Sequence, residues 1–314
     1  MMVVIAGIDV SKNSLEVSVA EGRTRAFRNT APGIGKLRAF LGEQSATRVV
    51  CEPTGGYERR LVRLLREADL PVQLAHPNRV RAFARVCGYE AKTDLLDAQI
   101  LARYGRMFPE PEARPAEPER QGLQDLLRRR QQLVAQRVQE RNRMRQELEA
   151  SVLQSTQRHI AWLDQEIAQL DQEYQDRLRQ HATLGQQAAL FRTVPGVGPI
   201  TAATLVAELP ELGHWDNKAL IALVGLAPWA RDSGQRQGHR SIRGGRGVVR
   251  RILYLAALSA IRTDATLSDF YQRLRQRGKA GKVALVAVMR KLLLRLNAVA
   301  RRGTPWRPEP LPTT

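Results

Sequence analysis

The chain has 314 residues, enough for two domains or for one domain with a large insertion, and it carries a net charge of +19. With 43% hydrophobic residues it fills ordinary cores, but no apolar run approaches the roughly 20 residues that cross a membrane. The N-terminus reads as a strand without a basic leader, so we expect neither a membrane protein nor a secreted one. The two cysteines indicate no disulfide framework and favour a reducing cytoplasm.

The first hundred residues alternate between strand patterns and helix patterns. Apolar or alternating runs predict strands at 3–9, 14–20, 23–29, 48–51 and 71–76. Helical patterns fall at about 34–44, after the turn at 53–56, and at about 78–87 and 93–107. A three-strand meander followed by alternating helices and strands predicts a mixed α/β sheet covered by helices, in the order that ribonuclease-H-like nucleases have. We assign residues 1–108 to this domain.

Four carboxylates in this domain stand where a strand ends or a helix begins: Asp9, Glu52, Asp94 and Asp97. Each has an ordinary explanation when taken alone, as a turn residue, a strand terminus, or a helix cap favoured by the helix dipole. Their combination in this strand order favours a site for Mg²⁺ (or Mn²⁺), because hard cations take oxygen ligands from several elements. Such a site activates a water or a hydroxyl for attack on a phosphodiester.

The middle of the chain is predicted to be a linker followed by long helices. The stretch 108–118 is rich in Pro and Glu, and Leu127, Val134, Leu163 and Ile167 then follow helical spacing. A break near Ser155-Thr156 predicts two helices that form a hairpin or coiled coil. We assign residues 109–184 to this segment and expect it to hold subunits or domains apart.

The C-terminal third is strongly basic. Residues 1–105 contain 16 Lys and Arg against 11 Asp and Glu, residues 106–185 contain 13 of each, and residues 186–314 contain 21 against 7. This asymmetry favours a nucleic-acid partner, with a solvated basic surface or adhesion to an acidic membrane as the alternatives. We expect a mostly helical domain over 185–303 and a disordered Pro-rich tail over 304–314.

Two motifs in this third concern nucleic acid. The segment 194–200 resembles the glycine hairpin of helix-hairpin-helix modules, in which N–H groups, here at Gly196 and Gly198, meet a DNA phosphate; a tight helix–helix turn explains it nearly as well. The segment after Pro228 is rich in arginine, which suits bidentate phosphate contacts: Arg236, Arg240, Arg243, Arg246 and Arg250.

This arginine-rich segment also contains two candidate hydroxyl groups. On chemistry alone Ser233 and Ser241 are equally plausible partners of a phosphodiester, and Ser233 beside Gly234 also reads as a turn residue. Neither serine has a neighbouring His–Asp pair that would indicate a hydrolase triad.

The motifs occur in one order that resembles the DEDD transposases of the insertion sequence 110 family, relatives of the pilin-gene invertases. The resemblance spans about residues 3–307 and rests on Gly7-Ile8-Asp9, Glu52-Pro53-Thr54-Gly55, Lys92-Thr93-Asp94 with Asp97, Pro195-Gly196-Val197-Gly198, and Gly225-Leu226-Ala227-Pro228 with Ser233-Gly234. It implies a RuvC-like domain whose metal ligands are Asp9, Glu52, Asp94 and Asp97, a coiled-coil insertion, and a C-terminal transposase domain in which Ser233 is the nucleophile.

The resemblance also implies a reaction and a set of partners. The serine would form a covalent bond with DNA, and a noncoding bridge RNA would pair with target and donor DNA. The two sites would come together between subunits of a homo-oligomer, a dimer to a tetramer, in the nucleoid of a bacterial cytoplasm.

Two alternative functions remain open from the sequence. A metal-dependent nuclease or Holliday-junction resolvase would use the same carboxylates with water as the attacking group, and it would form no covalent intermediate. A non-catalytic nucleic-acid-binding protein would use the acidic residues only as caps and turns.

Overall fold

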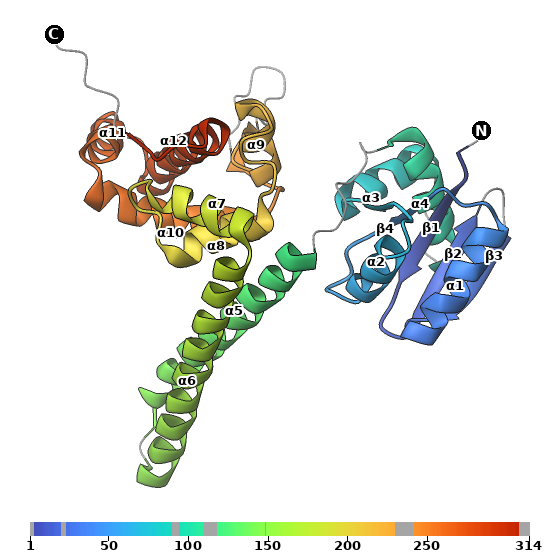
Figure 1. Ribbon diagram of the computed structural model, residues 1–314, viewed down its shortest axis with the longest axis horizontal. Helices are drawn as coiled ribbons and strands as arrows, with labels where there is room; N and C mark the ends of the chain where they lie inside the picture. The colour runs from blue at the N-terminus through green and yellow to red at the C-terminus, as the bar shows by residue number, and fades with distance from the viewer. Residues whose placement is uncertain are drawn as a thin grey trace. The chain divides into compact units, whose positions relative to one another are not determined.

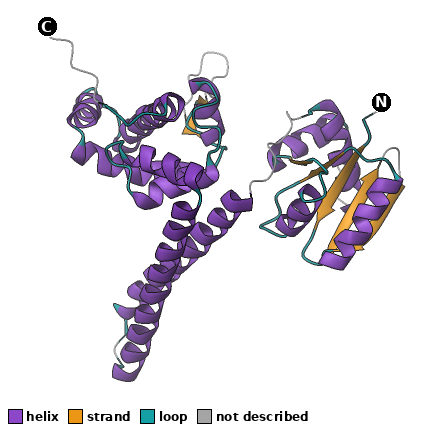
Figure 2. Ribbon diagram, viewed as in Figure 1, coloured by secondary structure: helices purple, strands orange, loops and turns teal. Residues whose placement is uncertain are grey.

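A computed structural model describes residues 3–19, 23–89, 94–109, 118–147, 149–229 and 241–307, with only the backbone described for Arg23 and for residues 94–96. The chain forms two compact units, Met1–Ala116 and Glu117–Thr314 (Figure 1). The first unit combines strands with helices, and the second is almost entirely helical (Figure 2).

The first unit is built on a five-stranded mixed sheet in the order β3-β2-β1-β4-β5. Its strands are β1 (Ile5–Val10), β2 (Ser14–Val19), β3 (Arg23–Arg28), β4 (Arg48–Cys51) and β5 (Val72–Leu74). The first three strands form an antiparallel meander, and β4 and β5 run parallel to β1. The predicted mixed sheet and its ribonuclease-H-like order are confirmed.

Helices cover both faces of this sheet. They are α1 (Ala31–Glu43), α2 (Glu58–Arg66), α3 (Pro77–Val86) and α4 (Asp94–Met107). On one face Ile8 and Val17 belong to a core shared with Leu37 of α1 and Leu61 of α2. On the other face Ile5 and Val50 pack with Ile100, Leu101 and Tyr104 of α4. The central strand is therefore buried on both sides, as is usual for a strand with a parallel neighbour between helical layers.

A long helical hairpin opens the second unit. It consists of α5 (Pro118–Met144) and α6 (Ala150–Gln180), which lie side by side along their length (Figure 1). Leu133, Leu163 and Ile167 form a small buried core between the two helices, and the helical spacing predicts Leu163 and Ile167 but not Leu133. The predicted Val134 is only partly buried against this core. The predicted break near Ser155-Thr156 is wrong, because α6 continues through these residues and the chain turns between Met144 and Ala150. The Thr156 hydroxyl donates to the carbonyl of Val152 (3.1 Å), so the helix accommodates it.

The base of this hairpin shares its core with the C-terminal helices. Leu123 and Leu127 of α5 and Tyr174 of α6 are buried in one cluster with residues such as Leu205 and Leu253. The expected boundary between residues 184 and 185 therefore does not coincide with a break in packing. Within the described residues, no helix is both long enough and apolar enough to span a membrane.

The C-terminal body contains six helices and a short strand pair within its described residues. They are α7 (Ala182–Arg192), α8 (Pro199–Glu208), α9 (Asn217–Val224), β6 (Pro228–Trp229), β7 (Ser241–Ile242), α10 (Gly247–Thr263), α11 (Ala265–Gln276) and α12 (Gly281–Arg302). The mostly helical prediction is confirmed. The predicted tail begins too early, because Trp306 packs against this core and its backbone N–H donates to the Thr193 hydroxyl (2.8 Å). Residues 308–314 lie outside the described part of the chain.

Candidate functional site

Asp9 and Glu52 stand at the same edge of the sheet in the first unit. The parallel register pairs Ile8 of β1 with Cys51 of β4, so Asp9 and Glu52 are the next residues along two neighbouring strands. Side chains alternate between the faces of a strand. Asp9 therefore shares a face with Ile5, which packs against α4. Both carboxylates are half-buried.

Gly7 brings the start of α4 to this edge. A methyl carbon added at Gly7 would lie 2.0 Å from the carbonyl oxygen of Ala98 and 2.4 Å from the backbone nitrogen of Ala102. Farther along the helix, a methyl carbon added at Gly105 would meet side-chain atoms of Val50 and Ile5. The helix thus runs antiparallel to β1, with its first turn above the carboxyl end of the strand.

The first turn of this helix, which contains Asp94 and Asp97, therefore lies at the same edge. Asp97 immediately precedes Ala98 and is half-buried, and Asp94 is the first residue of α4, with a side chain outside the described part. The backbone thus brings Asp9, Glu52 and the first turn of α4 together. Within the described residues, no three carboxylate, imidazole or thiol groups lie close enough to hold a metal ion. Carboxylate oxygens are the ligands that Mg²⁺ prefers, so the type of ligand at this edge fits such an ion. The described side chains alone do not form a complete set of ligands around one position.

The structure adds a carboxylate that the sequence analysis did not identify. Glu16 of β2 pairs directly with Asp9 across the antiparallel ladder, and it is half-buried. Side chains directly opposite each other lie on one face with Cβ atoms about 5 Å apart, and like charges in such pairs are destabilising. The strand register, which the sequence does not state, was needed to place Glu16 there.

Two buried polar side chains fix the loops that follow Asp9 and Glu52. The amide of Asn29 donates to the carbonyls of Ser11 (2.8 Å) and Tyr57 (3.2 Å), one in each loop. The carboxylate of Glu58 accepts from the backbone N–H groups of Thr54 and Gly56, both at 2.9 Å. Hydrogen bonds of this kind reduce the freedom of the backbone on either side of the two carboxylates.

Cys51 lies beside Glu52, but its thiol is unsuited to nucleophilic chemistry. Burial, and to a lesser extent the charge of Glu58, raise the pKa of Cys51 to about 12. The thiolate is the nucleophilic form of cysteine, so this side chain stays protonated and inert at neutral pH.

In the second unit the glycine hairpin joins α7 to α8, and its two glycines have different surroundings. A methyl carbon at Gly196 (φ +86°) would lie 2.6–2.7 Å from Ala256 and Ala260 of α10, so this glycine permits close packing between helices. Gly198 has open space around it and is the N-cap of α8, where no side chain accepts from the helix N–H groups. The predicted phosphate contact remains a prediction at both positions, and only Gly198 has room for a ligand.

The arginine-rich segment lies partly outside the described residues, which exclude Ser233, Arg236 and Arg240. Arg246 forms a bidentate ion pair with Glu211 (2.6 Å for each contact) and donates to the carbonyl of Glu208 (2.7 Å). Arg250 donates to the carbonyls of Val224 (3.2 Å) and Gly244. These two guanidinium groups hold the base of the segment, and their expected nucleic-acid contacts remain predictions.

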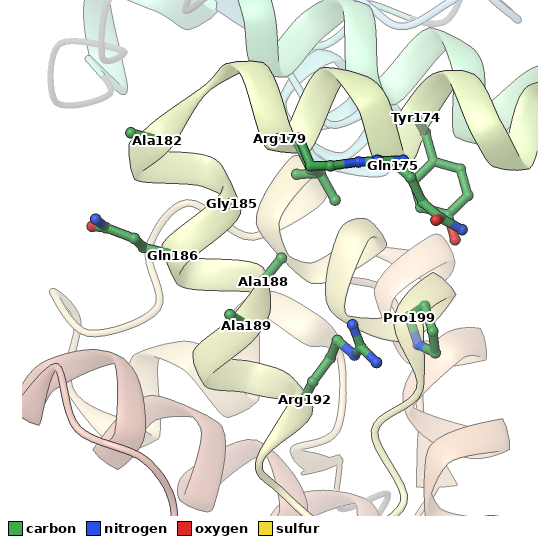
Figure 3. Close-up of a pocket in the computed structure, with 11 residues that line it drawn as sticks. Tyr174, Gln175, Arg179, Ala182, Gly185, Gln186, Ala188, Ala189, Arg192 and Pro199 are labelled. Atoms are coloured by element: carbon green, nitrogen blue, oxygen red, sulfur yellow. The ribbon is translucent and has the colours of Figure 1, made fainter.

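A cavity of about 550 Å³ lies between the end of α6, α7 and the start of α8 (Figure 3). Tyr174, Ala188 and Pro199 line it, and the guanidinium of Arg192 points toward Pro199. Its volume falls within the range of small-molecule sites. Burial raises the pKa of Tyr174, so its hydroxyl stays neutral.

Two family models match the chain. A DEDD-type model of the insertion sequence 110 class, described as a transposase, matches residues 6–153, and a model of the transposase IS116/IS110/IS902 family matches residues 188–272. The chain belongs to the IS110 transposase family. The first match covers the sheet edge with Asp9, Glu52 and Asp97, and the second covers the glycine hairpin and the segment with Ser233. The protein is therefore a DNA transposase or recombinase.

Relatives of this transposase include proteins of similar length. The pilin gene-inverting protein of Moraxella bovis is 28% identical over 311 residues, which cover 96% of each chain. An insertion element IS900 protein of 42 kDa from Mycobacterium paratuberculosis is 33% identical over 166 residues, covering 51% of this chain and 40% of that protein. Among solved structures, T. thermophilus RuvC in complex with a Holliday junction substrate is 18% identical, with a TM-score of 0.28, and the match covers 36% of this chain and all of that one.

Proposed function

We propose that this transposase cuts and rejoins DNA through a covalent serine–DNA intermediate, with Ser233 as the nucleophile and a divalent metal ion held by carboxylates. The observation that carries the proposal is the convergence of Asp9, Glu52 and the first turn of α4 at one edge of the sheet. Two strand ends and one helix start thereby supply acidic residues to a single edge, an arrangement that favours a hard cation with oxygen ligands from several elements.

The residues that would hold Mg²⁺ (or Mn²⁺) are Asp9, Glu52, Asp94 and Asp97. When bound, such an ion supplies Lewis acidity to the phosphoryl group and lowers the barrier to attack by a hydroxyl. Asn29 and Glu58 keep the loops around two of these carboxylates in place, which limits the reorganisation that metal binding requires.

The covalent step exchanges one phosphodiester bond for another, so it needs no external energy source. The Ser233 hydroxyl loses its proton and forms a bond to phosphorus, while the bond between phosphorus and one sugar oxygen breaks and that oxygen takes a proton. The phosphodiester is thereby exchanged for a phosphoserine ester, which a second DNA hydroxyl reverses to join new strands. Arginine side chains around the serine would balance the charge that develops on the phosphoryl oxygens.

The proposal includes two partners beyond DNA. A noncoding bridge RNA would pair with target and donor DNA, and the protein would act as a dimer to a tetramer. Family membership supports both, and the basic character of residues 186–314 suits RNA as well as DNA.

The test combines purified protein, magnesium, the noncoding transcript of the element and DNA that carries the joined element ends. On a denaturing gel we expect a protein–DNA adduct with wild type and none with Ser233→Ala. Ser241→Ala is the matched control, because it removes another hydroxyl of the same segment and should leave the adduct unchanged. Omission of the transcript should reduce the adduct if the RNA selects the DNA.

The carboxylates are tested in the same assay. Asp9→Ala and Asp97→Ala should abolish the adduct, whereas Glu43→Gln, an exposed acid at the end of α1, should not affect it. Magnesium-dependent cleavage without an adduct would instead establish the nuclease or junction resolvase. DNA binding that is indifferent to magnesium and to Asp9→Ala, without cleavage, would establish a binding protein.

A further inference from the structure

An exposed tryptophan stands at the base of the segment that carries Ser233. Trp229, the last residue of β6, is 50% exposed, although a large aromatic side chain of this kind is usually mostly buried. Its backbone is fixed by pairing with Ser241 of β7. The guanidinium of Arg243 lies over its ring, 4.6 Å from the ring centroid.

Hydrogen bonds and close backbone packing hold the base of the β6–β7 strand pair. The backbone N–H of Arg246 donates to the carbonyl of Leu223 (3.0 Å), and its side chain is held by Glu211. Gly225 and Gly245 both have positive φ, and a methyl carbon at Gly245 would lie 2.3 Å from the nitrogen of Gly225. The aromatic ring is thus presented on a fixed backbone, which lowers the entropy lost when a ligand binds it.

Exposure alone does not distinguish this side chain, because Trp162 is 47% exposed. Trp162 belongs to α6 and stacks on His159, with ring centroids 6.0 Å apart and 23° between the ring planes. The numbers of acidic and basic residues are equal in that part of the chain, residues 106–185. Trp229, in contrast, is followed through residue 251 by seven arginines and one acidic residue. A half-exposed indole with a guanidinium over its ring suits a planar base attached to an anionic backbone, the chemistry of a nucleotide.

Trp229 is also close to Ser233 in the sequence. Ser233 is the fourth residue after Trp229, and four residues of fully extended chain span at most about 14 Å. That distance corresponds to about four base steps of DNA.

We propose that Trp229, with Arg243 on its ring, is a stacking platform for an unpaired base of DNA close to the phosphodiester that Ser233 attacks. The position relative to the cut rests on the proposed function, whereas the stacking itself does not depend on it. Stacking is tolerant of sequence, so the platform holds a strand that has left its duplex and does not select the target.

The experiment uses full-length protein without magnesium, so that no strand is cut, and follows tryptophan emission as a single-stranded DNA oligonucleotide is added. Stacking of a base on an indole quenches its emission. We expect a decrease with wild type that is lost in Trp229→Phe and kept in Trp162→Phe, the matched control. Anisotropy of labelled DNA confirms that all three proteins bind. Trp229→Leu, which cannot stack, should bind the oligonucleotide about 5- to 150-fold more weakly.

Three outcomes would refute the stacking proposal. The first is an equal decrease in tryptophan emission in wild type and Trp229→Phe, and the second is an equal decrease with a fully paired duplex. The third is a decrease with an RNA oligonucleotide of the same sequence and none with DNA. Ser233→Ala should retain the decrease. An absent covalent adduct would therefore refute the serine mechanism and leave the stacking result unaffected.

Discussion

Gly7→Ala tests whether the first turn of α4 must lie over Asp9. The added methyl carbon would lie 2.0 Å from the carbonyl oxygen of Ala98, and ordinary contact begins at 3.4 Å, so helix and strand must separate locally by 1.4 Å. The neighbouring atoms are mainly backbone, which cannot rotate away. Asp97 would be displaced with the helix, and a misplacement of about 1 Å in a catalytic group costs on the order of 100-fold in rate.

The assay for Gly7→Ala is the rate of adduct formation with element-end DNA and magnesium, measured on protein whose fold is confirmed by circular dichroism. Overpacking also lowers the free energy of unfolding, by about 1–3 kcal/mol. The temperature is therefore kept well below the melting transition of the variant, so that the measured rate belongs to folded protein.

Two control variants separate the position of α4 from general destabilisation. Gly105→Ala inserts a methyl group under the other end of the same helix, 2.4 Å from a methyl group of Val50, far along α4 from Asp97. It should lose stability and keep most of its rate. Gly35→Ala on α1 has open space and should change neither property. A wild-type rate in folded Gly7→Ala would refute the inference that the first turn of α4 serves the site.

Two further predictions concern ion pairs of the second unit. Glu211→Gln removes the charged partner of Arg246 and should lower the free energy of unfolding by about 1–3 kcal/mol, as measured by urea denaturation; unchanged stability would mean that Arg246 does not hold the hairpin base. Asp164 accepts hydrogen bonds from Arg137 and Arg141, and the bond from Arg137 is the main reason that its folded-state pKa is lowered. Its stabilising effect is therefore full above the unfolded pKa of about 3.9 and is lost as the pH falls through the folded value. Asp164→Asn should accordingly melt below wild type at neutral pH and match it in strong acid; a difference in Tm that persists in acid would contradict the pKa argument.

The sheet of the first unit could be predicted from the sequence because its strands have strong local signals. Alternation in Ser14–Val19 and the apolar run before Glu52 identify strands without knowledge of their partners. The positions of Asp9, Glu52 and Asp97 at a common edge follow once the strand order is known, since parallel strands end together. Glu16 escaped prediction because it faces Asp9 only in one antiparallel register.

The second unit was less accessible to prediction because its decisive contacts join residues that are far apart in the sequence. The pairing of Arg246 with Glu211 spans 35 residues, so a run of arginines could not be divided into structural and ligand-binding members. The strand pair that exposes Trp229 has only two residues in each strand, too few for a periodic pattern. The position of the hairpin turn was missed for a different reason: a single Thr is compatible with a helix interior when its hydroxyl bonds to the backbone.

The two units hold different parts of the proposed chemistry. Three described acidic side chains of the C-terminal body are already engaged: Glu211 binds Arg246, Asp216 caps α9, and Asp264 caps α11 and binds Arg295. A carboxylate in such a role is a poor ligand for a hard cation, because it would have to leave its partner uncompensated. In the proposed mechanism, Ser233 would therefore act with a metal ion held at the carboxylate edge of a first unit, in the same chain or in another copy. If the proposed mechanism holds, the serine–DNA bond requires residues of both kinds of unit, and neither unit is expected to form that bond alone.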